Sequence, residues 1–157
     1  MQRKRIPMMS TPSPEYSELQ VQVGERINSQ IALSHEEIAT FARLSGDLNP
    51  LHHNATYAQK TRFGGVIVSG PQLISLMMGL LATRFSRETA MLGLEFAFQF
   101  RKAVKAGELI TMEWEIVHAE PKASLQGVLA DLDGKATNDQ EQIVLTGKGR
   151  VLITAKL

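Results

Sequence analysis

The sequence contains no cysteine among its 157 residues. A disulfide framework, a thiolate zinc site and a cysteine nucleophile are therefore excluded, and a cytoplasmic location is expected. A dominant charge is also missing, because 17 Lys and Arg residues against 16 Asp and Glu residues leave a formal net charge of +1. This balance gives no reason to expect binding to nucleic acid or to an anionic membrane surface.

The sequence also lacks an unbroken apolar run that could span a membrane. The uncharged stretch 63–83 approaches the ~20 residues that a membrane helix needs. Gly64, Gly65, Gly70 and Pro71 interrupt its first half. A buried core helix preceded by a short strand or loop is therefore the better interpretation.

The N-terminal residues 1–19 are basic at first and then rich in Pro, Ser and Met. They lack the apolar core of a signal peptide, so we expect a flexible leader. The remaining residues, 20–157, are enough for one domain with a sizeable core, and a second domain is not expected.

The first half of the sequence carries helix signals. Ser34 and Glu37 form a capping-box pattern that opens an amphipathic helix, and Gly46 ends it. Pro71 suits the first turn of a longer helix over residues 70–85. This segment is apolar around nearly its whole circumference, which predicts a helix buried on most sides.

The second half alternates apolar and polar residues, which is typical of strands. The alternation runs through residues 91–102 and 109–118, with a weaker third strand over 124–132. We expect residues 133–142 to form a polar loop and residues 143–157 to form a final strand whose glycines mark a bulge or bend. Helices followed by antiparallel strands predict an α+β fold.

The alternation also predicts side-chain directions. His118 should lie on the same face of its strand as Trp114. One face of the preceding strand should carry Leu92, Leu94, Phe96, Phe98 and Phe100.

A polar loop follows the first helix and contains the candidate catalytic residues. Asp47 and His52 are separated by Asn49 and Pro50, and a proline-stiffened turn can bring such side chains together. A carboxylate and an imidazole can move protons to and from a bound water near neutral pH. Asn49 could orient that water or hold the loop, and His53 is an alternative partner for Asp47. A purely structural loop is the competing interpretation.

Residues 41–58, FARLSGDLNPLHHNATYA, resemble the signature of the MaoC-like dehydratases and (R)-specific enoyl-CoA hydratases. The resemblance extends over about residues 20–155. The residues that match are Phe41, Ser45, Gly46, Asp47, Asn49, Pro50, Leu51, His52 and Ala58. It implies a single hot-dog domain, in which a curved antiparallel sheet wraps around one long central helix, and it implies a homodimer.

The resemblance also implies an activity, the interconversion of trans-2-enoyl-CoA and (R)-3-hydroxyacyl-CoA. Asp47 and His52 would hold the water, and the backbone N–H of Gly70 would stabilise negative charge on the thioester oxygen. Asn49, Ser69 and Met78 are the expected substrate-positioning residues. Ser69 stands where many members have His, and Met78 where many have a small or hydroxyl residue. CoA is part of the substrate, and no cofactor or metal is expected.

Two other functions are possible on this scaffold. An acyl-CoA thioesterase would usually need a carboxylate on the central helix, and residues 70–85 contain none. A non-catalytic subunit that binds acyl thioesters would not need the intact Asp47, Asn49 and His52 set. Candidates for contact with the CoA phosphates are Arg62, Arg84, Arg87, Arg101 and Lys102.

Overall fold

The computed structural model describes residues 18–156. The predicted leader, residues 1–19, lies outside this range except for its last two residues, of which Leu19 is buried in the core. The elements in chain order are β1 (Arg26–Ala32), α1 (His35–Ser45), the 3-10 helix η2 (Pro50–His52), α2 (Ala55–Gln59), α3 (Gly70–Phe85), β2 (Thr89–Phe100), β3 (Leu109–Lys122), η3 (Ala123–Leu125), β4 (Gly127–Asn138) and β5 (Ile143–Ala155).

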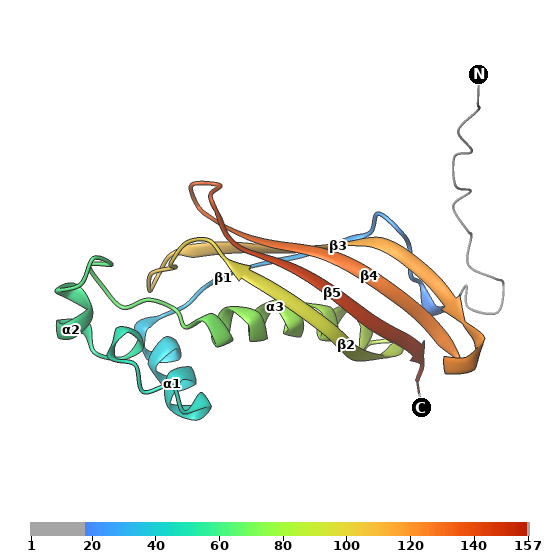
Figure 1. The fold of residues 1–157 in the computed structure, drawn as a ribbon, viewed down its shortest axis with the longest axis horizontal. Coiled ribbons are helices and arrows are strands. Elements are labelled where there is room, and N and C mark those ends of the chain that lie inside the picture. The colour runs from blue at the N-terminus through green and yellow to red at the C-terminus, as the bar shows by residue number, and fades with distance from the viewer. Residues whose placement is uncertain (1–17, 157) are drawn as a thin grey trace, which may run out of the picture.

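All five of these strands form one antiparallel sheet in the order β1-β3-β4-β5-β2. The sheet curves over α3, and α1 and α2 lie together at one end of the molecule (Figure 1). Helix α3 contacts β1, β2 and β3. A long helix wrapped by a curved antiparallel sheet is the hot-dog arrangement, so the α+β prediction is confirmed.

Helix α3 buries one side and leaves the other exposed. Leu73, Met77, Leu81 and Phe85 recur at helical spacing and are all buried. The opposite side includes Met78, which is 36% exposed. The prediction of burial on most sides is therefore wrong, because the sheet of residues 18–156 covers only one face of α3. No helix in this part of the chain is long and apolar enough to cross a membrane.

Trp114 on β3 is the largest of the fully buried side chains in the core. Its indole Nε1–H donates to the backbone oxygen of Met77, 2.9 Å away, and so ties the sheet to α3. The rings of Phe96 and Phe98 contact it edge-on, each with a centroid separation of 6.0 Å. These side chains lie on glycines of the neighbouring strands, Gly134, Gly147 and Gly149.

The glycines correct one prediction and part of a second. Residues 133–142 do not form only a loop, because β4 continues to Asn138 with Gly134 placed beneath Trp114. A Cβ atom on Gly134 would lie 2.5 Å from Cε3 of Trp114. Gly147 and Gly149 do not mark a bulge either, because the pairing of β5 with β2 is regular at both.

Two bulges reverse the predicted side-chain directions. The β2–β5 register shifts between Gly93 and Glu95, and Leu92 and Leu94 are 59% and 52% exposed. They therefore do not share the inner face of Phe96 and Phe98 as predicted. A second shift, between Ile116 and His118 on β3, leaves His118 exposed instead of beside Trp114.

Candidate active site

The end of α1 positions Asp47. Gly46 adopts a left-handed conformation with φ 74°, which ends the helix and turns the chain. The N–H of Asp47 then donates to the oxygen of Ala42 at 2.9 Å. The carboxylate Oδ1 accepts from the N–H of Asn49 at 3.1 Å, so the loop holds the Asp47 side chain through its own backbone.

Asn49 holds the next turn of the loop. Its Oδ1 accepts from the N–H of Leu51 at 3.1 Å and caps η2, in which Pro50 occupies the first turn. The backbone N–H of His52 donates to the oxygen of Asn49 at 3.0 Å. Of the two roles considered for Asn49, the structure provides the contacts for loop support.

His52 is buried, and its ring is fixed on one side. Nδ1 lies 2.8 Å from the backbone oxygen of Ile67, and because a carbonyl can only accept, Nδ1 carries a proton. The opposite nitrogen, Nε2, lies 3.4 Å from Oδ2 of Asp47. In the neutral imidazole, the Nε2 lone pair and the carboxylate therefore converge on one place. Two such acceptors can share a proton or hold one water between them.

His53 is not brought to Asp47. Its Nε2 lies 3.1 Å from the backbone oxygen of Leu48, and the side chain is exposed. The predicted pair of Asp47 with His52 is thus the one whose side chains meet.

Ser69 and Gly70 form the start of α3. Ser69 is fully buried, and its Oγ accepts from the N–H of Gln72 at 3.4 Å, which caps the helix. Within residues 18–156, the N–H of Gly70 makes no hydrogen bond. A Cβ atom on Gly70 would lie 2.8 Å from Cζ of Phe100. Glycine therefore permits the close approach of the last residue of β2.

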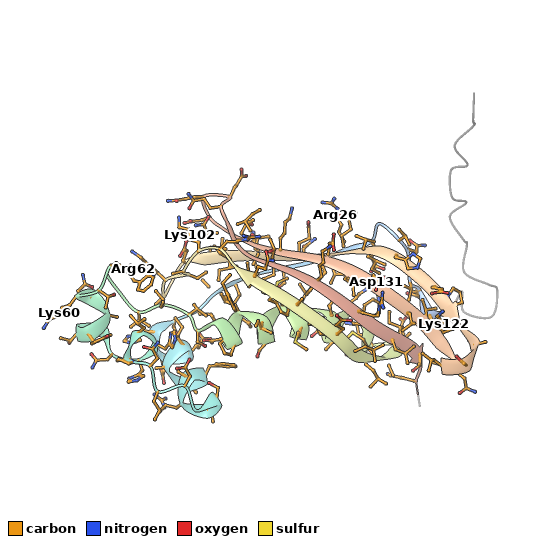
Figure 2. All side chains as sticks on the ribbon, in the orientation of Figure 1. Arg26, Lys60, Arg62, Lys102, Lys122 and Asp131 are labelled. Atoms are coloured by element: carbon orange, nitrogen blue, oxygen red, sulfur yellow. The ribbon has the colours of Figure 1, made fainter. Side chains whose placement is uncertain are left out.

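A cavity of about 400 Å³ joins His52 to Gly70. Asn49 also lines it, whereas Asp47, Ser69 and Met78 are not among its lining residues. Its other lining residues are Leu51, Arg62, Phe63, Ile67, Val68, Leu73, Phe100, Arg101, Lys102, Ala103 and Val104. Arg62 lies close to α2, and Lys102 lies in the same half of the molecule (Figure 2).

Sequence reasoning missed two parts of this site. The carbonyl of Ile67, which fixes the ring of His52, is 15 residues from it in the sequence. Phe100 was assigned only to a strand, although it lies against Gly70. The role of Ile67 could not be read from the sequence, because every residue has a backbone carbonyl. The role of Phe100 could not be read either, because its contact with Gly70 depends on how β2 lies beside α3.

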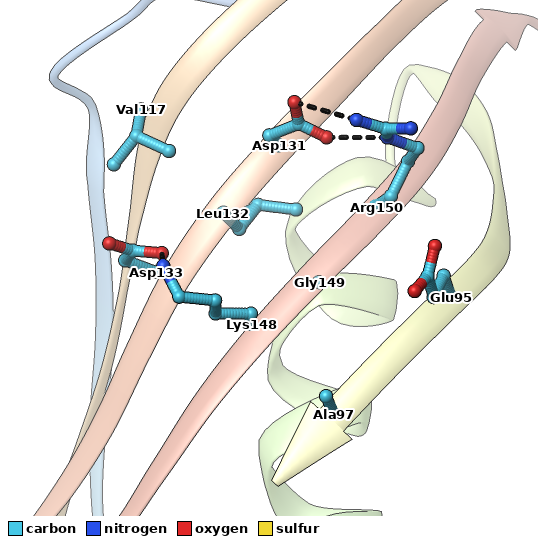
Figure 3. Close-up of a pocket in the computed structure, with 9 residues that line it drawn as sticks. All are labelled: Glu95, Ala97, Val117, Asp131, Leu132, Asp133, Lys148, Gly149 and Arg150. Atoms are coloured by element: carbon cyan, nitrogen blue, oxygen red, sulfur yellow. Dashed lines mark hydrogen bonds and ion pairs between the residues drawn. The ribbon is translucent and has the colours of Figure 1, made fainter.

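The outer face of the sheet carries a second hollow, lined by charged residues (Figure 3). Arg150 donates from Nε and Nη2 to the two carboxylate oxygens of Asp131, at 2.6 and 3.1 Å. These hydrogen bonds lower the pKa of Asp131 despite its partial burial. Lys148 pairs with Asp133 at 2.9 Å. Four of the five charged residues that line this hollow are thus paired with one another, and Glu95 is the fifth.

A model of a known family, described as a MaoC like domain, matches residues 18–134. The chain belongs to the MaoC-like family. The chain is 33% identical over 96 residues to an (R)-specific enoyl-CoA hydratase of Aeromonas caviae, a match covering 61% of this chain and 71% of the relative. It is 27% identical over 107 residues to a 3-hydroxybutyryl-CoA dehydratase of Methylorubrum extorquens, a match covering 68% of this chain and 66% of that relative.

The fold is also similar to a solved structure, the (R)-hydratase from A. caviae involved in PHA biosynthesis. The TM-score is 0.76 and the sequence identity 28%, over 84% of this chain and 96% of that one. These relatives are hydratases and dehydratases, so this MaoC-like chain is an enzyme of the carbon–oxygen lyase class.

Proposed function

We propose that the chain adds water across the double bond of trans-2-enoyl-CoA to give (R)-3-hydroxyacyl-CoA, and catalyses the reverse reaction. The observation that carries this proposal is the pair formed by Asp47 Oδ2 and His52 Nε2, 3.4 Å apart, with His52 Nδ1 held by a backbone carbonyl. The names of the relatives support the same reaction.

The pair accounts for both protons of the reaction. A water held between Asp47 and His52 loses one proton to the pair as its oxygen bonds to C3. The electrons of the double bond move toward the thioester oxygen, and the acid form of the pair then delivers a proton to C2. All atoms of water are thus in the product, and the pair returns to its starting state.

The start of α3 supplies the charge stabilisation. The N–H of Gly70 has no hydrogen-bond acceptor within residues 18–156 and is aligned with the dipole of a 16-residue helix. A donor of this kind lowers the barrier by about 3–4 kcal/mol when it is aimed at a developing oxyanion. Ser69 positions this donor by capping the helix. Asn49 and Met78 complete the proposed substrate-positioning set.

The proposal needs no resident cofactor or metal, because CoA enters as part of the substrate. We further propose a cytoplasmic homodimer. Strand β2 stands at the edge of the sheet and exposes Leu92 and Leu94, and such edges are normally covered.

The first prediction tests the reaction and the pair together. Crotonyl-CoA absorbance is followed after mixing with wild type, Asp47→Asn, His52→Ala and the control His53→Ala. Loss of general acid–base catalysis should lower kcat by ~10²–10⁴-fold in the first two variants. His53→Ala should keep most of the activity, because the His53 ring is bonded to the oxygen of Leu48, whereas the ring that meets Asp47 is that of His52.

Two results would contradict the proposal. Release of free thiol together with the free enoic acid, and no formation of 3-hydroxyacyl-CoA, would indicate a thioesterase. Inertness of the folded wild type toward enoyl-CoA of every chain length would indicate a non-catalytic binder.

A further inference from the structure

Three cations line the cavity that contains His52 and Gly70. Arg62, Arg101 and Lys102 are all exposed, whereas His52 is 7% exposed, so the cations stand at the cavity mouth and the imidazole lies inside. The lining includes no Asp or Glu. The mouth of the cavity is therefore positively charged.

The charge of these cations is not compensated by acidic residues. Arg62 lies over the ring of Phe63, with Cζ 4.9 Å from the ring centroid. Arg101 donates to the amide oxygen of Gln99, and Lys102 to that of Gln142, and both acceptors are neutral. None of the three cations forms an ion pair within the part of the chain that the structure describes.

One extended segment, residues 66–68, links the cations to the catalytic pair. The oxygen of Ile67 holds His52, and the N–H of Val68 donates to the oxygen of Val104 at 2.8 Å. On the other side, the N–H groups of Arg101 and Lys102 both donate to the oxygen of Val144, at 2.9 and 3.2 Å. The backbone of Arg101 and Lys102 is thus held by β5, and Val104, two residues on, is bonded to the segment that holds the imidazole.

We propose that Arg62, Arg101 and Lys102 bind the nucleotide phosphates of CoA, so that the enzyme favours CoA thioesters over thioesters without these phosphates. This inference rests on the proposed function. The reactive end of the substrate must reach His52 and Gly70, and its neutral pantetheine arm then leads outward to the diphosphate and 3′-phosphate. Guanidinium and ammonium groups at the mouth match these anions, and Arg can bind them bidentately.

The other two cations expected from the sequence, Arg84 and Arg87, do not line this cavity. Arg84, a candidate from the sequence, pairs with Glu25 at 2.7 Å, away from the cavity. Arg87 lies beyond the far end of α3 and does not line the cavity. A carrier protein would offer a single phosphodiester with no 3′-phosphate, so the three cations would have fewer charges to bind.

The second prediction compares crotonyl-CoA with the crotonyl thioester of N-acetylcysteamine, which has no phosphate. The ratio of kcat/KM for the two substrates should fall ~10–100-fold in Arg101→Gln/Lys102→Gln and ~3–10-fold in Arg62→Gln. In wild type the ratio should also fall as salt is raised. Arg87→Gln is the matched control and should leave the ratio unchanged. Circular dichroism confirms that each variant is folded.

Binding of CoA, measured by calorimetry, separates this inference from the proposed function. If wild type hydrates neither thioester but CoA binding weakens in the cavity variants and not in Arg87→Gln, the proposed function fails and the phosphate site stands. If both thioesters are hydrated with the same ratio in every variant, the phosphate site is overturned. It is also overturned if CoA binds the wild type and the double variant equally, or binds neither.

Discussion

Gly70 combines two roles that a larger residue could not. Its N–H is placed at the first turn of α3, and its missing side chain admits Phe100. A methyl group here would meet Cζ of Phe100 at 2.8 Å. Phe100 is 53% exposed, so its ring can move away from the added methyl group. Because both residues line the cavity, the moved ring and the methyl group would change the shape of the cavity wall.

The third prediction follows from this geometry. Gly70→Ala should change the free energy of unfolding little, because the contacted atom is the tip of an exposed ring. It should lower kcat/KM by ~10–100-fold, because the thioester oxygen can no longer reach the N–H at its best distance. Urea denaturation and crotonyl-CoA absorbance measure the two effects.

Gly79→Ala is the matched control, since a Cβ atom there meets nothing within 4 Å. Alanine in the interior of α3 should stabilise the helix by ~0.5–1 kcal/mol and leave catalysis unchanged. Equal activity of the Gly70→Ala and Gly79→Ala variants would contradict the assigned role of Gly70.

The candidate pair could be predicted because its determinants are local. Gly46 and Pro50 bracket the turn that brings Asp47 to His52, and all four lie within seven residues of one another. The support for His52 could not be predicted, because the acceptor is a backbone oxygen on a segment that returns later in the chain. Residue types indicate local turns, but they do not indicate contacts that distant segments make through backbone atoms.

At the scale of the elements, the sheet depends on glycines under aromatic rings. Gly134 on β4 pairs with Trp114 on β3, and its missing side chain lets the indole lie flat against the strand. Trp114 is fully buried and bonded to Met77 on α3, so the ring cannot move as Phe100 can. The same change of Gly to Ala should therefore have opposite consequences at Gly134 and Gly70.

The fourth prediction is that Gly134→Ala destabilises the fold. A Cβ atom 2.5 Å from Cε3 of Trp114 must displace a packed ring or the β4 backbone, which costs about 1–3 kcal/mol. The urea midpoint measures this loss. Gly65→Ala, where a Cβ atom meets nothing within 4 Å, is the control. Equal midpoints for the two variants would show that Trp114 is not held against β4.

Element types were predictable, but their bulges were not. Strict alternation placed Leu94 and His118 correctly within strands, because period two is a local property. One extra residue at each bulge reversed the faces on which these side chains lie. No residue type in either strand indicates the position of the bulge. The extent of β4 was missed for a related reason: Gly134 lowers strand propensity but is required beneath Trp114.

At the scale of the whole molecule, β2 has one unpaired edge, and this edge is long. It spans 12 residues and carries Leu92 and Leu94 on the exposed side. Exposed edge strands associate unless charge or covering segments prevent it. The last residue of β2 is Phe100, which lies against Gly70, so covering this edge and shaping the cavity involve the same strand.

The fifth prediction tests the proposed homodimer. Leu94→Lys introduces a charge on an apolar edge, and burying an unpaired ammonium costs several kcal/mol, so light scattering after size exclusion should show a monomer where wild type shows a dimer. Leu125→Lys is the control, because Leu125 is similarly exposed, at 45%, but lies in η3. It should remain a dimer. Because β2 also shapes the cavity through Phe100, Leu94→Lys should raise KM for crotonyl-CoA as well. A Leu94→Lys protein that remains a dimer would contradict the prediction and place the interface elsewhere.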